Sequence, residues 1–275
     1  MECNVADLLD RARLLLSQCQ PDVAVKFIER AIEQDSNDMA ALDMLAEVLL
    51  ELDRTEEAVR ALRRSIDLYP NSNANKYMSL AQLLSGREAL GLYERGIQLM
   101  LSGIDRDDSS VAAAYSAIAE LFMTDLCDED NAESNCEAAV EAAVNVRSDC
   151  PDPYRVMASL RIIQGRYEEA EAAVRSGLER IASSPFETRL DLAKSCIELG
   201  MFTDGLDLVD DLLAEDDRDC QLWVMAALCY LKEGNAEIAV EYCHAARAMA
   251  LKQDDREMLN EIDAIQHELD NTPTT

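Results

Sequence analysis

The chain has 275 residues, with only six prolines and nine glycines to form turns and 5% aromatic residues, which disfavours a strand-rich core and indicates an all-α fold. Lysine and arginine total 25 against 55 aspartates and glutamates, so the formal net charge is −30. Nucleic acids and anionic membranes would be repelled, whereas a basic protein would be attracted. The same acidity also keeps a protein soluble, so composition alone leaves both readings open.

A small residue recurs along the chain at the same place in successive segments, each time shortly after a turn. These residues are Ala24, Ala58, Ala89, Cys136, Ala170, Gly205 and Ala239, with spacings of 34, 31, 47, 34, 35 and 34. A second series, including Leu45-Ala46, Leu80-Ala81 and Met157-Ala158, marks close crossings in the first helix of each segment. A period of about 34 residues is typical of tetratricopeptide repeats, which are helical hairpins stacked into a solenoid.

The pattern predicts seven hairpins and a capping helix in one right-handed superhelical domain over residues 1–270. In chain order, the repeats are expected at about 4–38, 39–72, 73–105, 109–150, 151–184, 185–219 and 220–253. A helix over 255–269 should cover the last exposed apolar face, and 271–275 should be a disordered tail.

Two repeats depart from the period. Only eight residues separate Ala81 from Ala89, where other repeats have twelve, so the turn at Ser85-Gly86 must be tight. The fourth repeat carries an acidic insertion at residues 124–131. Its acids could form a binding lip, or the insertion could be a solvated loop without a partner.

The first helices of such hairpins line a concave groove, where carboxylates can attract lysine and arginine and amides can hold a peptide backbone. The residues predicted to contact a protein ligand are Asp43, Glu47, Glu51, Asn75, Met78, Gln82, Glu120, Asp125, Asp128 and Asp152. A clamp for acidic chaperone tails would need a lysine and an asparagine four residues apart on a first helix. Asp43 and Glu47 hold those sites in the second repeat. A binder of a basic protein is therefore favoured, with a scaffold or co-chaperone adaptor in an unrelated complex as the alternative.

No residue pattern points to catalysis, a cofactor or a metal. The two histidines, His244 and His267, have no recognisable catalytic partners, and the nine cysteines include no Cys-x-x-Cys pair. We expect no enzyme activity and free cysteines in a reducing compartment. The first ten residues lack a basic start followed by an apolar run, so we expect no signal peptide and a location in the cytoplasm and nucleus. We also expect the free protein to be a monomer.

The third repeat is more specific than the general pattern. Its sequence Asn75-Lys76-Tyr77-Met78-Ser79-Leu80-Ala81-Gln82-Leu83 is followed by Gly86, Glu88-Ala89-Leu90, Tyr93 and Gly96-Ile97. Together with the long acidic fourth repeat and Gln164-Gly165-Arg166, it resembles the dedicated assembly chaperones of large-subunit ribosomal protein four. The resemblance implies a newly made basic ribosomal protein as ligand. Its long internal loop would be shielded in the groove while the protein is escorted into the nucleus for pre-ribosome assembly.

Overall fold

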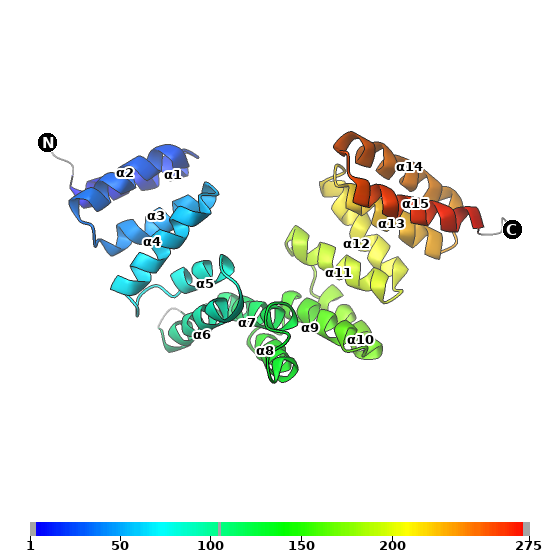
Figure 1. Cartoon of the computed structure of the whole chain (residues 1–275), viewed down its shortest axis with the longest axis horizontal. Helices are drawn as coiled ribbons and strands as arrows, with labels where there is room; N and C mark the ends of the chain where they lie inside the picture. Colours follow the sequence, from blue (N-terminus) through cyan, green and yellow to red (C-terminus); the bar gives the residue numbers. More distant parts are fainter. Residues whose placement is uncertain (1–3, 104–105, 272–275) are drawn as a thin grey trace. The chain divides into compact units, whose positions relative to one another are not determined.

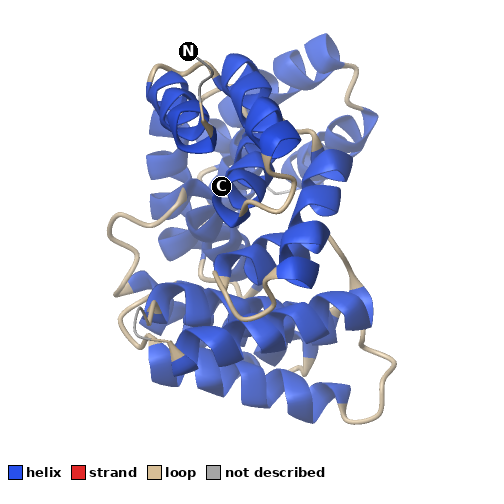
Figure 2. Ribbon diagram, turned by 90° about the vertical axis from the view of Figure 1, so that its left-hand side faces the viewer, coloured by secondary structure: helices blue, strands red, loops and turns tan. Residues whose placement is uncertain are grey.

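The computed structural model describes residues 4–103 and 106–271, and every regular element in these ranges is an α-helix (Figure 2). This confirms the predicted all-α fold class. Contacts along the chain divide it into two compact units, Met1–Ala139 and Val140–Thr275, called unit 1 and unit 2 below. The expectation of one continuous right-handed superhelix over residues 1–270 stays a prediction.

Figure 1 colours the helices by their position in the sequence, from blue near the N-terminus to red near the C-terminus. Unit 1 contains α1 (Val5–Ser17), α2 (Pro21–Gln34), α3 (Met39–Glu51), α4 (Thr55–Leu68), α5 (Asn75–Gln82), α6 (Gly86–Ser102) and α7 (Asp108–Met123). Helix α8 (Ala132–Val146) begins in unit 1 and ends in unit 2. Unit 2 continues with α9 (Asp152–Ile163), α10 (Tyr167–Leu178), α11 (Phe186–Glu198), α12 (Phe202–Glu215), α13 (Cys220–Lys232), α14 (Ala236–Gln253) and α15 (Arg256–Asn271).

Consecutive helices pack in pairs, as a hairpin repeat requires. In unit 1, α1 packs on α2, α3 on α4 and α5 on α6; in unit 2, α9 packs on α10, α11 on α12 and α13 on α14. Helices α7 and α8 are tied by a bond from the Cys136 thiol to the Ala119 carbonyl oxygen, 3.4 Å long. The described part of the chain therefore holds the seven predicted hairpins, followed by α15 as the capping helix.

Small residues sit where the two helices of a hairpin cross, as the spacing predicts. All seven of the recurring small residues are buried, and Ala24, Ala58 and Ala239 have no exposed surface. Larger side chains fill the space around these crossings, such as Leu192, Leu212 and Leu222 in the core of unit 2. Burial of each such side chain stabilises the folded protein by about 1.5–3 kcal/mol relative to leaving it exposed. Packing between neighbouring hairpins therefore supplies most of the stability.

Local sequence signals set the helix ends. The side chain of Asn4 accepts a bond from the Asp7 amide at 2.9 Å, and the Asp7 carboxylate accepts from the Asn4 amide at 3.2 Å, which forms a capping box at α1. The side chain of Asp38 caps α3 through the Ala41 amide at 2.7 Å. These caps bind amides that the first helical turn leaves without intrahelical partners.

The two irregular hairpins differ from the others in their connections. Helix α5 has only eight residues, and α6 begins at Gly86, whose φ of 60° is a conformation that glycine adopts without steric cost. Helix α7 ends at Met123 and α8 begins at Ala132, so the segment between them is residues 124–131. The tight turn and the insertion thus lie where the sequence predicts them.

Helix α15 covers the last hairpin. Its buried residues Ile262, Ile265 and Leu269 join a core with α13 and α14 that includes Ala246 and Ala250. The helix runs two residues beyond the expected end, so Asn271 is helical. The rest of the expected tail, 272–275, lies outside the described residues.

Candidate protein-binding site

Helix α3 carries three carboxylates on one face, because Asp43, Glu47 and Glu51 follow one another at four-residue intervals. Glu47 and Glu51 are exposed, and neither forms an ion pair with a residue in the described part of the chain. Partial removal from water raises the pKa of Glu47, and the negative charges of Asp43 and Glu51 raise it further. This acidic face, defined by the three residues, therefore favours an approaching cation.

Asp43 has a structural function as well. Its Oδ1 accepts a hydrogen bond from the Ser65 hydroxyl at 2.5 Å, and its Oδ2 accepts one from the Asn73 side-chain amide at 2.8 Å. Both oxygens are therefore engaged with the end of α4 and the segment before α5. Asp43 contributes negative charge to the acidic face, whereas Glu47 and Glu51 are free to pair with a ligand.

Beside Asp43 lies a buried lysine that the pattern of predicted groove residues did not single out. Lys76 is 2% exposed, and its Nζ donates to the carbonyl oxygens of Ser65 at 3.1 Å and Tyr69 at 2.6 Å and to the Ser72 hydroxyl at 3.2 Å. Burial lowers the pKa of Lys76, and the charge of Asp43 acts in the opposite direction. Lys76 thus caps the carboxyl end of α4, where it adds hydrogen bonds to two carbonyl oxygens that backbone amides also contact.

The three predicted residues of α5 divide between surface and interior. Asn75 and Gln82 are exposed, as a groove residue should be. Met78 is 9% exposed, and a Cβ on Gly96 would lie 2.7 Å from its Cε atom, so its side chain packs against α6. Met78 is therefore a core residue and not part of the candidate binding surface, because the missing side chain at Gly96 leaves room for it against α6.

Glu120 is half-buried on α7. Burial raises the pKa of the Tyr93 hydroxyl, and the negative charge of Glu120 adds to the effect, which places the carboxylate near α6. Glu120 therefore belongs to the contact between α6 and α7 at least as much as to a ligand surface.

The acidic insertion contacts the preceding hairpin. Asp125 Oδ2 accepts a hydrogen bond from the Gly86 amide at 2.8 Å, which caps α6, and Glu129 forms an ion pair with Arg87. Asp128 is exposed. Asp125 thus anchors the insertion to the tight turn, a function that its sequence context did not reveal, while Asp128 remains available to a ligand.

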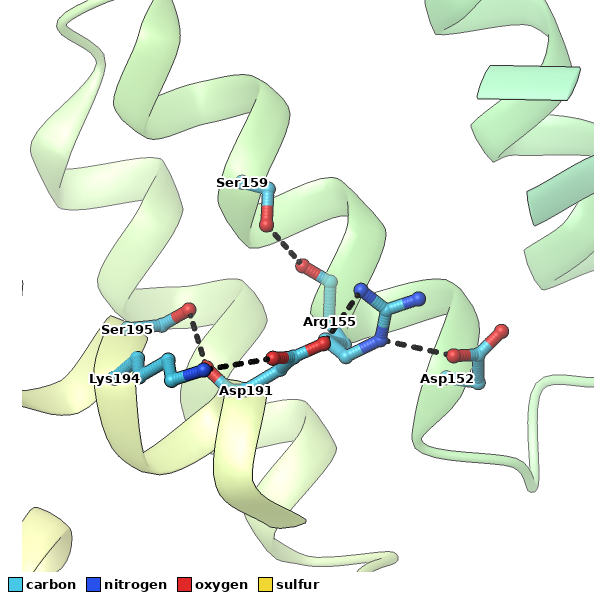
Figure 3. Close-up of polar contacts among 6 residues, drawn as sticks. All are labelled: Asp152, Arg155, Ser159, Asp191, Lys194 and Ser195. Atoms are coloured by element: carbon cyan, nitrogen blue, oxygen red, sulfur yellow. Dashed lines mark hydrogen bonds and ion pairs between the residues drawn. The ribbon is translucent and has the colours of Figure 1, made fainter. Parts of the chain in front are cut away.

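The predicted residue in unit 2, Asp152, lies in a charge-balanced cluster (Figure 3). The Arg155 guanidinium donates through Nε to Asp152 at 2.9 Å and through a terminal nitrogen to Asp191 of α11 at 3.3 Å. Lys194 Nζ lies 3.7 Å from the other oxygen of Asp191. Because two cations match two carboxylates here, this cluster offers less negative charge to a ligand than the acidic face of α3. Asp191 and Lys194 were not predicted, since their pairing depends on how α9 packs against α11.

Other kinds of site are not evident in the described ranges. These residues contain no cluster of three or more histidines, cysteines, aspartates and glutamates arranged to hold a metal ion. No helix among them has the length and apolarity needed to cross a membrane.

Paired helices that recur with a period of about 34 residues define the chain as a tetratricopeptide-repeat protein. A family model described as tetratricopeptide repeat matches residues 9–73, which run from α1 to the segment before α5. The solved structure of the Assembly Chaperone of RpL4 (Acl4) has a TM-score of 0.76 and 26% identity to this chain, covering 86% of this chain and 99% of that one.

Two curated proteins are similar over most of the length. The "Probable assembly chaperone of rpl4" of Schizosaccharomyces pombe is 30% identical and covers 86% of this chain and 77% of that protein. The protein of the same name from Emericella nidulans is 28% identical, covering 81% of this chain and 63% of that longer protein. The chain therefore belongs to the family of assembly chaperones of rpl4. Membership of this family confirms the predicted resemblance and the prediction of a binding protein rather than an enzyme.

Proposed function

We propose that this protein is a dedicated chaperone of rpl4, and that it holds a basic segment of that ribosomal protein against the acidic face of α3. The observation that carries the site is the row of Asp43, Glu47 and Glu51 on one face of α3, where Glu47 and Glu51 form no ion pair with a residue in the described part of the chain. The relatives named for rpl4 supply the identity of the ligand.

The physical logic is the masking of charge. A newly made basic segment would bind RNA or other polyanions indiscriminately, and a protein with a net charge of −30 competes for it. Each exposed ion pair contributes about 0–1 kcal/mol, so binding needs several of them or a few partly desolvated arginines. Nascent ribosomal RNA, a denser polyanion, can then displace the chaperone at the site of assembly.

The proposal includes the setting in which the protein works. We place it in the cytoplasm and nucleus as a monomer when free, with no direct binding to nucleic acid or membranes. Its strong negative charge supports the last point, because phosphates would be repelled within a Debye length of about 8 Å at physiological salt.

Co-expression with tagged rpl4 tests the proposal. We expect the protein to be recovered in a stoichiometric complex with soluble rpl4, identified by mass spectrometry. A wash at raised salt should dissociate the complex, since charge pairs dominate it. Recovery of several unrelated partners without rpl4, or a complex indifferent to salt, would show that the protein is instead a general scaffold.

A further inference from the structure

A second surface of unit 1 has a shape and chemistry of its own. A hollow of about 640 Å³ lies between α6, α7 and the beginning of α8, and it is called the α6–α8 hollow below. Its floor is apolar and includes Tyr115, Ile118 and Phe122 of α7. At its edge Leu101, in the last turn of α6, is 43% exposed. An exposed leucine beside an apolar hollow indicates a place where a partner can bury apolar surface.

The same chain contains a smaller hollow at the corresponding place in an earlier repeat. It lies between α2, α3 and α4 and has a volume of about 200 Å³. Its floor is formed by Leu42, Leu45 and Leu49, which have the same spacing on α3 as Tyr115, Ile118 and Phe122 have on α7. The two hollows are therefore equivalent positions of the repeat, and they can be compared residue by residue.

The comparison shows which side chain the larger hollow lacks. Two arginines, Arg60 and Arg64, line the smaller hollow, and none lines the larger one. Arg60 lies two residues after the buried Ala58, and Ala138 lines the larger hollow two residues after the buried Cys136. An exposed alanine thus stands on α8 where α4 has an arginine.

The acidic side of the hollow is retained. Glu29 lines the smaller hollow five residues after Ala24, and Glu94 lines the larger one five residues after Ala89. Glu94 is exposed and forms no ion pair with a residue in the described ranges.

The insertion of the fourth repeat builds one wall of the hollow. Glu129 lines it, and the bond from the Gly86 amide to Asp125 fixes the insertion against the start of α6. The lining thus includes the carboxylates of Glu94 and Glu129 and the amides of Gln98 and Asn135, with no lysine or arginine. The hydrogen bond from Gly86 to Asp125 and the ion pair of Glu129 with Arg87 therefore hold this wall in place.

We propose that the α6–α8 hollow docks an amphipathic segment of a partner protein, with apolar side chains on the floor and an arginine or lysine beside Glu94. Charge complementarity selects this occupant: the hollow has a glutamate at the position of Glu29, lacks both arginines of the smaller hollow and has an apolar floor. The surface is distinct from the acidic face, because the equivalent smaller hollow is lined by Leu42, Leu45 and Leu49 of α3 and by none of the three carboxylates of that face. It therefore offers the protein a second interaction while the acidic face is occupied.

The test uses the full chain and a labelled synthetic helical peptide of about 14 residues, with leucines on one face and arginines beside them. Fluorescence anisotropy should show saturable binding, and Ala138→Arg, which restores the arginine of the smaller hollow, should weaken it about tenfold or more. Ala172→Arg is the matched control, because Ala172 is an exposed alanine two residues after Ala170 on α10. This control adds the same charge at the same repeat position and should leave the affinity unchanged.

Two further arms separate this surface from the acidic face of α3. The variant Glu47→Lys with Glu51→Lys should retain the affinity for the arginine peptide that Ala138→Arg weakens. A peptide with glutamates in place of the arginines should bind the unmodified protein at least about tenfold more weakly than the arginine peptide does. Circular dichroism of each variant checks that the helices persist. Equal binding by Ala138→Arg and Ala172→Arg, or equal binding of the two peptides, would overturn the proposal. A dimer of the free protein that Ala138→Arg dissociates would overturn it too, by assigning the hollow to a second copy of the chain.

Discussion

Replacement of Lys76 by methionine tests whether a buried cation holds the third hairpin in place. Lys76 Nζ donates to the Ser65 carbonyl, the Tyr69 carbonyl and the Ser72 hydroxyl, and the side chain is 2% exposed. Lys76→Met keeps the aliphatic length of the side chain but removes the ammonium group. The variant therefore isolates the contribution of hydrogen bonds and charge, and it also leaves Asp43 without its nearby cation.

The magnitude follows from what the acceptors retain. Tyr69 N still donates to the Ser65 carbonyl at 2.9 Å, and Ser72 N still donates to the Tyr69 carbonyl at 3.2 Å, so neither oxygen is left without a partner. The lowered pKa of Lys76 shows that burial of its charge already costs free energy. We therefore expect Lys76→Met to lower the free energy of unfolding by about 0.5–1.5 kcal/mol, the net contribution of a hydrogen bond whose acceptors keep other partners.

Urea denaturation followed by circular dichroism measures this loss. Lys26→Met is the matched control, because Lys26 is an exposed lysine on α2 and its replacement should change stability by less than about 0.5 kcal/mol. Hydrogen exchange should localise the loss in Lys76→Met to α4 and α5, since repeat proteins open locally. Equal denaturation midpoints for the two variants would refute the reasoning.

Two glycines of α6 and the acidic face give further predictions. Gly91→Ala should raise the free energy of unfolding by about 0.5–1 kcal/mol, since a Cβ at this position meets no atom within 4 Å. Gly96→Ala should lower the free energy of unfolding, because its Cβ would displace Met78. Thermal denaturation measures both changes, and similar shifts for the two variants would contradict this prediction. The raised pKa of Glu47 means that ionisation of this carboxyl costs stability at pH values above its ordinary pKa of about 4.3. A bound cation should lower the pKa of Glu47, so binding should release a proton at pH values just above the ordinary pKa. Calorimetry in two buffers measures the release, and Glu47→Gln should abolish it; an unchanged release would assign it to another group.

The repeat architecture could be predicted from the sequence because it depends on short-range spacing. The recurring small residues, from Ala24 to Ala239, mark crossings between adjacent helices, and each is buried where the period places it. The tight turn before Gly86 and the insertion at 124–131 were also predictable, since both change the number of residues between fixed positions. A solenoid is favourable for such reasoning because each hairpin contacts only its neighbours.

The roles of individual polar residues could not be predicted in the same way. Asp43 and Glu47 occupy equivalent sites on one face of α3, yet only Asp43 bonds Ser65 and Asn73. Asp125 and Asp128 belong to one acidic run, but only Asp125 reaches the Gly86 amide, 39 residues earlier. These pairings depend on contacts between hairpins, whereas the sequence pattern indicates only which face of a helix a residue occupies.

Met78 shows that the repeat register alone does not predict whether an apolar residue lies in the groove or in the core. The repeat register assigns it to the groove, as it assigns Asp43 on α3, but the absence of a side chain at Gly96 lets it pack into the interior. A methionine is compatible with either place, since it is flexible and apolar. The residue type therefore gave no signal that could have corrected the register.

The affinity of purified rpl4 for charge-reversed variants, measured over a range of salt, tests the acidic face most directly. Glu47→Lys with Glu51→Lys reverses two carboxylates on α3, and Glu237→Lys with Glu241→Lys makes the same change in net charge at exposed residues of α14. We predict that wild-type affinity falls steeply as salt rises, and that the α3 variant binds at least about tenfold more weakly than the α14 variant at low salt. Equal affinities of the two variants, or wild-type binding that is insensitive to salt, would contradict the account.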